Sequence, residues 1–263
     1  MPLSGWICPG CHREVPLPSH KPPVANDHFE GPCGEIVHSD YANAVMKGRQ
    51  GHEKDVGQVR VSNLIGCPRS YAIQQSENYY TDPLSGNSAE TGTAWHSHME
   101  TNSVDPSNTE VEVSGTLIGI KVAGKVDRIR NGMIEDWKHQ NDFAKKYLKE
   151  PKPIHVAQVS LYAELVAQSK GWRPTHGIIW NHFTTGMVPM KFPIMALGDV
   201  LAMVIGSGTV LDNLQEMAKF AASKIKWAEM RMVGEKIEYG QKTACDYCPV
   251  RGICWTEDRK APF

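Results

Sequence analysis

The chain has 263 residues, of which 41% are hydrophobic, and this composition provides ample apolar material for a packed core. No apolar run approaches the roughly 18 residues that a membrane helix needs, and the N-terminus lacks the basic-then-apolar layout of a signal peptide. The formal net charge is -1, so a nucleic-acid site would have to be a local basic groove. We expect a cytoplasmic protein that does not contact a membrane.

The composition changes near residue 58. Residues 1–58 are rich in Pro, Gly and His and show no sustained helical or strand period, whereas periodicity is clear from Val59 onward. We therefore predict two domains, a small module over 1–58 and a main domain over 59–263.

The main domain alternates between helical and strand patterns. The patterns predict a helix over 88–101, strands over 110–114 running into 116–122, over 125–130 and over 133–138, a helix over 154–170, strands over 176–183 and near 187–194, and a long helical region over 197–232. Gly171 is expected to end the second helix. This order predicts an α/β or α+β mixed sheet with a helical C-terminal region.

Asn131-Gly132 is the strongest hairpin signal in the chain, because a type I′ turn needs a positive φ at both central positions. A two-residue loop between strands 125–130 and 133–138 would place Asp127 directly opposite Asp136. Like charges so close destabilise a sheet, so a cation is expected between them.

The residues around this hairpin fit phosphodiester hydrolysis. Mg²⁺ or Mn²⁺ prefers hard oxygen ligands, and the two-residue strand period places Lys138 on the same face as Asp136. A lysine there can orient the nucleophile or offset developing negative charge. His96 could complete a metal site from the preceding helix, and Gln158 and Tyr162, four residues apart on the next helix, could reach the substrate backbone.

Together these residues resemble the RecB-like branch of the PD-(D/E)XK nucleases in order and spacing, through Gly92-x-x-x-His96, Gly124-Lys-Val-Asp127, Asp136-Trp-Lys138 and Gln158-x-x-x-Tyr162. Val126 stands where the family name has Pro. The resemblance implies a restriction-endonuclease-like core. Its implied metal ligands are His96, Asp127, Asp136 and the Trp137 carbonyl, its catalytic lysine is Lys138, and its supporting DNA contacts are Gln158 and Tyr162.

Four cysteines bracket this core, Cys67 before it and Cys245, Cys248 and Cys254 after it. Four thiolates suit zinc or an iron-sulfur cluster, and the spacing alone does not choose. The bracketing resembles the iron-sulfur RecB-like nucleases, which include the CRISPR-associated fourth-family exonucleases and helicase-nuclease subunits. That resemblance implies a [4Fe-4S] cluster that clamps the domain.

The N-terminal module carries a second set of candidate metal ligands. Cys8-Pro-Gly-Cys11 and Cys33 predict a zinc-ribbon-like site. We take His28 as its fourth ligand, with His38 and His20 as alternatives.

The main hypothesis is a Mg²⁺- or Mn²⁺-dependent deoxyribonuclease, an exonuclease on single-stranded DNA or DNA ends. Its expected settings are DNA repair, recombination, phage DNA processing or CRISPR-type adaptation in a bacterial, archaeal or phage-infected cell, with recombination or replication proteins as possible partners. The alternatives are a non-cutting nucleic-acid-binding accessory protein and an electron-transfer iron-sulfur protein.

A group of lysines after the Asp-x-Lys strand could neutralise phosphates, namely Lys145, Lys146, Lys149 and Lys152.

Overall fold

The computed structural model describes residues 3–7, 14–16, 59–67, 70, 79–81, 87–204, 209, 211 and 248. The chain divides into two compact units. The first unit contains Met1–Lys54, Pro68–Glu90 and Lys226–Phe263, and the second contains Asp55–Cys67 and Thr91–Ile225. The predicted domain boundary near residue 58 stays a prediction.

The first unit contains a three-stranded sheet in the order β2-β1-β4. In it, β1 (Leu3–Ile7) pairs antiparallel with β2 (Glu14–Pro16) and parallel with β4 (Tyr79–Thr81). The predicted zinc ligands lie outside the described residues, and so do the two alternatives His38 and His20. These ligands are Cys8, Cys11, His28 and Cys33.

The second unit is built on a six-stranded mixed sheet, in which β3-β6-β7-β8-β9 follow one another and β5 also pairs with β6. The strands are β3 (Val59–Arg60), β5 (Thr109–Leu117), β6 (Ile120–Arg130), β7 (Met133–His139), β8 (His176–Phe183) and β9 (Gly186–Pro193). β6 is antiparallel to β5 and β7 and parallel to β3, while β8 is parallel to β7 and antiparallel to β9. The predicted mixed sheet is confirmed.

One edge of β6 is shared by two strands. β5 pairs along almost the whole of β6, from Ile120 to Arg128, so β3 and β7 have to occupy the opposite edge. There β3 pairs with Val122 and Ala123, and β7 pairs with 128–130. Residues 124–127 of β6 therefore have no strand partner on that edge among the described residues. This gap lies at the Gly-Lys-Val-Asp motif.

The strand prediction over 116–122 is wrong, because the chain reverses at Ile118 and Gly119. Both residues have a positive φ, 51° and 78°, and Leu117 pairs with Ile120 across the turn. A β-branched residue with a positive φ is uncommon, so the turn has no clear sequence signal. Gly115 and Gly124, which fall outside the predicted strands 110–114, 116–122 and 125–130, lie inside β5 and β6.

The hairpin predicted at Asn131-Gly132 is confirmed, with φ values of 51° and 72° that match a type I′ turn. Arg130 faces Met133, and Arg128 faces Glu135, as the two-residue loop requires. The paired ladder stops there, so the predicted pairing of Asp127 with Asp136 does not form.

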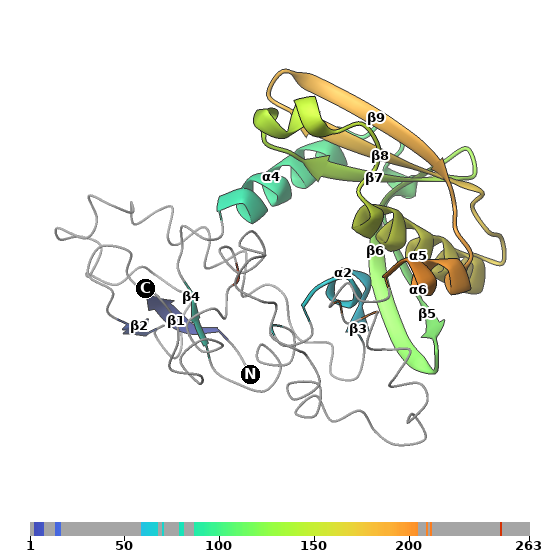
Figure 1. The fold of residues 1–263 in the computed structure, drawn as a ribbon, viewed down its shortest axis with the longest axis horizontal. Coiled ribbons are helices and arrows are strands. Elements are labelled where there is room, and N and C mark those ends of the chain that lie inside the picture. The colour runs from blue at the N-terminus through green and yellow to red at the C-terminus, as the bar shows by residue number, and fades with distance from the viewer. Residues whose placement is uncertain are drawn as a thin grey trace. The chain divides into compact units, whose positions relative to one another are not determined.

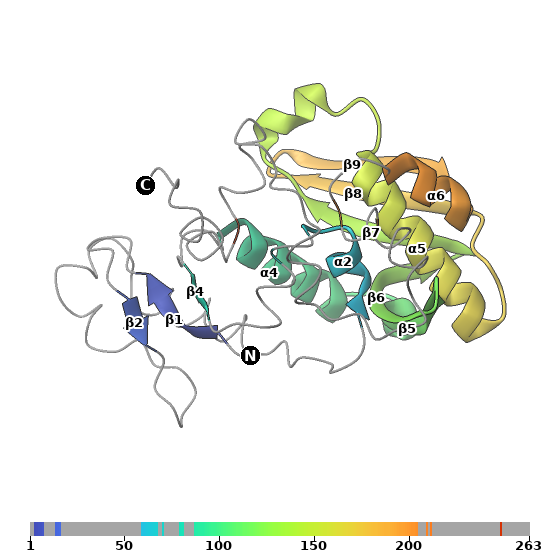
Figure 2. The ribbon, with the colours of Figure 1, turned by 60° about the horizontal axis from the view of Figure 1, so that its bottom comes forward.

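Helices cover the sheet. They are α2 (Val61–Leu64), α4 (Asn87–Thr101), α5 (Pro153–Lys170) and α6 (Leu197–Val204), with the 3-10 helices η4 (Pro106–Asn108) and η5 (Asp142–Tyr147). α5 crosses the sheet against β5, β6, β7 and β8, and α6 packs against α5 (Figures 1 and 2). Gly171 ends α5 with a φ of 76°, as predicted. Of the helix predicted over 197–232, α6 covers the start, and most of the remainder lies outside the described residues.

None of the described helices is long and apolar enough to cross a membrane.

Gly124 allows α5 to approach β6 closely. A Cβ at this position would lie 2.4 Å from Cε1 of Tyr162 and 3.2 Å from Cγ2 of Val61. Real Cβ atoms essentially never approach another carbon within 3.0 Å. The absence of a side chain at Gly124 therefore lets the Tyr162 ring pack directly on the backbone of β6.

We expect Gly124→Ala to lower the free energy of unfolding by about 1–3 kcal/mol, because the added methyl displaces the buried Tyr162 ring. Chemical denaturation measures this change. The matched control is Gly198→Ala on α6, where a Cβ would meet nothing within 4 Å. Equal unfolding midpoints for the two variants would contradict the packing argument.

Candidate metal and catalytic centre

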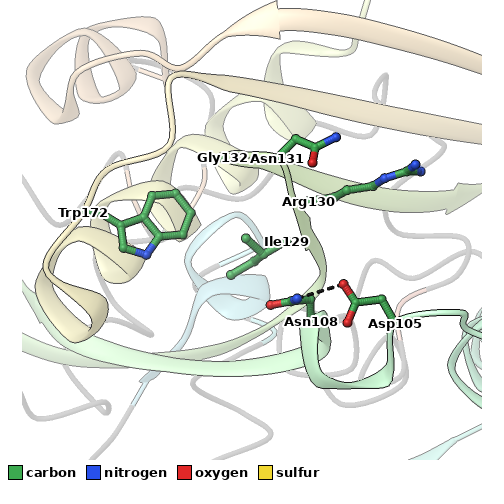
Figure 3. Close-up of a pocket in the computed structure, with 7 residues that line it drawn as sticks. All are labelled: Asp105, Asn108, Ile129, Arg130, Asn131, Gly132 and Trp172. Carbon is green, nitrogen blue, oxygen red and sulfur yellow. Dashed lines mark hydrogen bonds between the residues drawn. The ribbon is translucent and has the colours of Figure 1, made fainter.

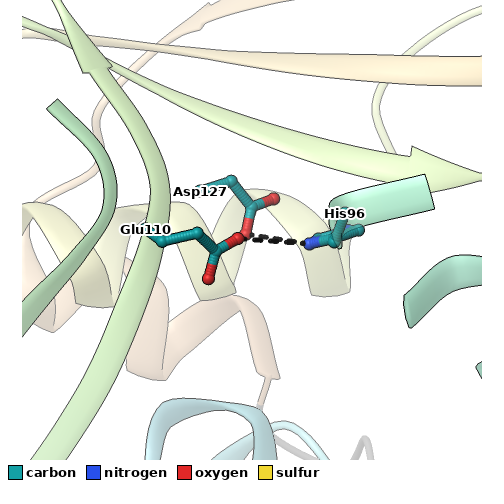
Figure 4. Close-up of side chains that lie close together, drawn as sticks. All are labelled: His96, Glu110 and Asp127. Carbon is teal, nitrogen blue, oxygen red and sulfur yellow. Dashed lines mark ion pairs between the residues drawn. The ribbon is translucent and has the colours of Figure 1, made fainter. Parts of the chain in front are cut away.

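Three side chains converge beside the gap on β6. His96 of α4, Glu110 of β5 and Asp127 of β6 each offer one ligand atom, and these atoms all lie within 4.8 Å of one another (Figure 4). Nδ1 of His96 lies 3.4 Å from Oδ1 of Asp127 and 3.7 Å from Oε1 of Glu110. One nitrogen and two carboxylate oxygens form a donor set that suits a divalent cation such as Mn²⁺.

The backbone of Trp137 positions two members of this group. Its amide donates a 2.6 Å hydrogen bond to Oδ2 of Asp127, and its carbonyl oxygen lies 2.8 Å from Nε2 of His96. Because the amide bonds to a side chain, it is not available to a backbone carbonyl of β6. The β6–β7 ladder therefore ends, and the carboxylate occupies the opening between the strands.

Charge holds the group together in the absence of a metal. Burial would lower the pKa of His96, but its contacts with Asp127 and Glu110 outweigh burial and raise the pKa to about 10. A protonated His96 thus supplies the positive charge between the two carboxylates. A bound divalent cation would supply that charge instead and would need the neutral ring.

Buried Asp136 and half-buried Lys138 form an ion pair next to this group. Nζ of Lys138 lies 2.9 Å from each oxygen of Asp136, but only Oδ1 has hydrogen-bonding geometry, and the buried Oδ2 accepts no hydrogen bond. Burial raises the pKa of Asp136, and the charge of Asp127 adds to this effect. Burial alone would lower the pKa of Lys138, but Asp136 and Asp127 raise it, so the amine is a cation. The two side chains lie on the same face of β7, as the two-residue strand period predicts.

Glu110 is a site residue that the sequence reasoning missed. Its φ of 52° interrupts the regular strand, and its neighbours Thr109 and Val111 pair with Arg128 and Val126, which places Glu110 across from Asp127. Contacts with His96 and Lys125 lower its pKa despite burial, and Lys125 Nζ lies 2.7 Å from Oε2. The signal that would have identified Glu110 is the β5–β6 register.

α5 brings a line of polar side chains to the centre. Gln158 and Tyr162 are both buried, and Nε2 of Gln158 donates a 3.4 Å hydrogen bond to Oη of Tyr162. Burial raises the pKa of Tyr162, and the negative charges of Asp136 and Asp127 raise it further. One turn earlier, burial and the charge of Lys138 lower the pKa of His155 to about 4. His155 was not foreseen and is a neutral neighbour of the Asp136–Lys138 pair at neutral pH.

Other conspicuous polar groups of the hairpin have different partners. Glu135 pairs with Arg128 and accepts a 3.1 Å hydrogen bond from Nε1 of Trp180, so its carboxylate is engaged away from His96 and Asp127. A pocket of about 450 Å³ lies at the turn end of the hairpin (Figure 3). It is lined by Asp105, Asn108, Ile129, Arg130, Asn131, Gly132 and Trp172. None of these residues belongs to the cluster of His96, Glu110 and Asp127. We therefore take the edge of β6 at residues 124–127, which has no strand partner in the described part of the chain, and not this pocket, as the candidate catalytic site.

The structure describes two of the four cysteines that are predicted to bind an iron-sulfur cluster. Cys67 and Cys248 are half-buried free thiols that belong to different units, and Cys248 donates a hydrogen bond to Oγ of Ser70 over 3.5 Å. Cys245 and Cys254 lie outside the described residues.

Comparisons with known proteins agree with this architecture. The solved structure named SSO0001 is similar over 88% of this chain and 99% of its own, with 18% identity and a TM-score of 0.54, which shows a shared fold. A candidate exonuclease from Eubacterium rectale aligns over 73% of each chain with 15% identity, but its TM-score of 0.29 carries no argument. No curated protein matches. Residues 100–255 match the sequence model of the PD-(D/E)XK nuclease superfamily. Because this match spans more than half of the chain and includes the Asp127, Asp136 and Lys138 positions, the chain belongs to the PD-(D/E)XK nuclease superfamily.

Proposed function

We propose that this protein is a metal-dependent deoxyribonuclease that acts as an exonuclease on single-stranded DNA or DNA ends. The observation that carries the proposal is the meeting of buried acidic groups, His96 and a half-buried lysine cation where β6 and β7 separate. The proposed settings are DNA repair, recombination, phage DNA processing or CRISPR-type adaptation.

The residues present fit a divalent cation. Glu110 and Asp127 offer hard oxygen donors next to His96, and the buried Oδ2 of Asp136 accepts no hydrogen bond. We assign these four side chains and the Trp137 carbonyl as the groups that would hold Mg²⁺ or Mn²⁺. When bound, the ion supplies Lewis acidity toward the phosphate and lowers the pKa of an attacking water.

We assign Lys138 and two side chains of α5 to contacts with the DNA substrate. The Lys138 ammonium, held by Asp136, is placed to stabilise negative charge as it develops on the phosphate oxygens. A protonated lysine cannot act as a general base, so its role is electrostatic or orienting. Gln158 and Tyr162 are assigned to holding the centre from α5 and supporting contact with the DNA backbone.

Two further cofactors belong to the proposal. Cys67, Cys245, Cys248 and Cys254 are proposed to bind a [4Fe-4S] cluster, which would crosslink distant parts of the chain and restrict its unfolded state. Cys8, Cys11, His28 and Cys33 are proposed to bind zinc. Support for the zinc site comes from β1 and β2, because Cys8 and Cys11 fall in sequence between these two antiparallel strands.

We expect Asp136→Asn and Lys138→Met each to reduce cleavage of end-labelled DNA with Mn²⁺ by about 10²-fold or more, because the first removes a charged ligand of the proposed metal ion and the second removes the cation that stabilises developing negative charge. Glu112→Gln is the matched control, since Glu112 is exposed on β5, two residues from Glu110. Circular dichroism establishes that each variant is folded. Full activity in both centre variants would refute the mechanism.

Glu110→Gln is expected to weaken Mn²⁺ binding by about tenfold or more, because the amide keeps the shape of the side chain but loses the charge. Isothermal titration calorimetry on the purified full chain measures this affinity. Glu112→Gln should bind Mn²⁺ like the wild type. An unchanged affinity in Glu110→Gln would remove Glu110 from the ligand set.

Metal analysis after anaerobic purification tests the two cysteine sites separately. We expect about four iron and four sulfide per chain together with one zinc. Cys248→Ser should lose iron while it keeps zinc, and Cys8→Ser should show the reverse. A loss of zinc in Cys248→Ser would contradict the iron-sulfur assignment.

A further inference from the structure

η5 exposes two large aromatic rings directly after the strand that carries Asp136 and Lys138. Phe143 is 67% exposed and Tyr147 is 64% exposed, and their ring centroids lie 5.4 Å apart. Neither ring contributes to the core. Exposed aromatic side chains that cluster on a surface mark a binding site more often than isolated ones do.

One lysine lies over both rings, and three more are close in sequence. Nζ of Lys146 lies 4.1 Å from the centre of the Phe143 ring and 4.7 Å from the centre of the Tyr147 ring. Residues 142–152 contain four lysines but only two acids, Asp142 and Glu150, and Asp142 accepts a hydrogen bond from Thr184. The segment therefore combines exposed ring faces with local positive charge on a chain of near-zero net charge.

The segment is fastened to the sheet. Oδ1 of Asn141 caps η5 by accepting a 2.9 Å hydrogen bond from the Phe143 amide. At the other side, Lys145 donates a 3.0 Å hydrogen bond to Oγ1 of Thr185 in the β8–β9 turn. A fixed segment loses less conformational entropy on binding than a free one.

Side-chain contacts link α4, the helix that carries His96, with the segment that leads into η5. Trp95, next to His96 in sequence, stacks on His182 with the ring centroids 3.7 Å apart and the planes 12° apart. Nδ1 of His182 lies 3.3 Å from Nδ1 of His139, the residue after Lys138. The amide of Gln140 then bonds to the His182 carbonyl over 2.9 Å, and η5 begins two residues later. η5 therefore follows directly on a segment that is held against β8 and, through the ring of His182, against α4.

We propose that η5 is a platform for the single-stranded part of the DNA substrate, with bases stacked on Phe143 and Tyr147 and phosphates paired with Lys146 and Lys149. This proposal rests on the proposed nuclease function and specifies its substrate. Aromatic faces can stack only with bases that are not already stacked in a duplex, whereas lysines alone would bind either form. The combination selects single strands.

The test is binding of a fluorescein-labelled oligothymidine to the full chain in EDTA, measured by anisotropy, so that no cutting occurs. We expect Phe143→Leu and Tyr147→Leu each to weaken binding by about tenfold, because leucine keeps apolar volume but has no ring face. Phe143→Tyr, which keeps the ring, should restore the affinity. Replacing Lys146 and Lys149 with Gln should lower the slope of log affinity against log salt by about 1.4.

Trp172→Leu is the matched control, because Trp172 is a partly exposed ring at the hairpin pocket, and it should bind oligothymidine like the wild type. A closed hairpin duplex should bind equally to the wild type and the leucine variants of η5. Unchanged oligothymidine affinity in Phe143→Leu and Tyr147→Leu, in a protein that cuts DNA, would overturn the platform alone. Loss of affinity in these variants of a protein that never cuts would overturn the nuclease function and leave the platform standing.

Discussion

The hydrogen bond from the Trp137 amide to the Asp127 carboxylate, 2.6 Å long, is the constraint on which the centre depends. By engaging the amide, it ends the β6–β7 ladder at Arg128 and Glu135 and keeps the strands apart. The carbonyl of the same residue then lies against His96. The backbone of one residue thus fixes a carboxylate from β6 and a ring from α4 at the same opening.

The opening concentrates negative charge that the fold has to balance. Glu110, Asp127 and Asp136 are partly or fully buried, and burying a carboxylate without a partner costs several kcal/mol. His96 and Lys138 provide opposing charges. One buried oxygen of Asp136 and one of Glu110 still accept no hydrogen bond. These two oxygens are the physical link between the fold and the metal site that we propose.

The carboxylates, the lysine cation and η5 all lie within residues 100–255, the part of the chain that matches the superfamily model. η5 begins three residues after the end of β7 and exposes two aromatic rings next to Lys146. The proposed platform and the proposed catalytic centre are therefore neighbouring features of the same unit.

The sequence by itself determined the local geometry, and only the tertiary structure decided how the centre closes. Asn131-Gly132 specified a type I′ turn, and the two-residue strand period specified the contact of Asp136 with Lys138, because both depend on neighbours along the chain. Ile118 does not signal its turn, so the β5–β6 register and the place of Glu110 became visible only in the folded sheet. The opening itself arises where β3 and β7 share an edge of β6. That arrangement depends on pairing between segments distant in sequence, which no local pattern encodes.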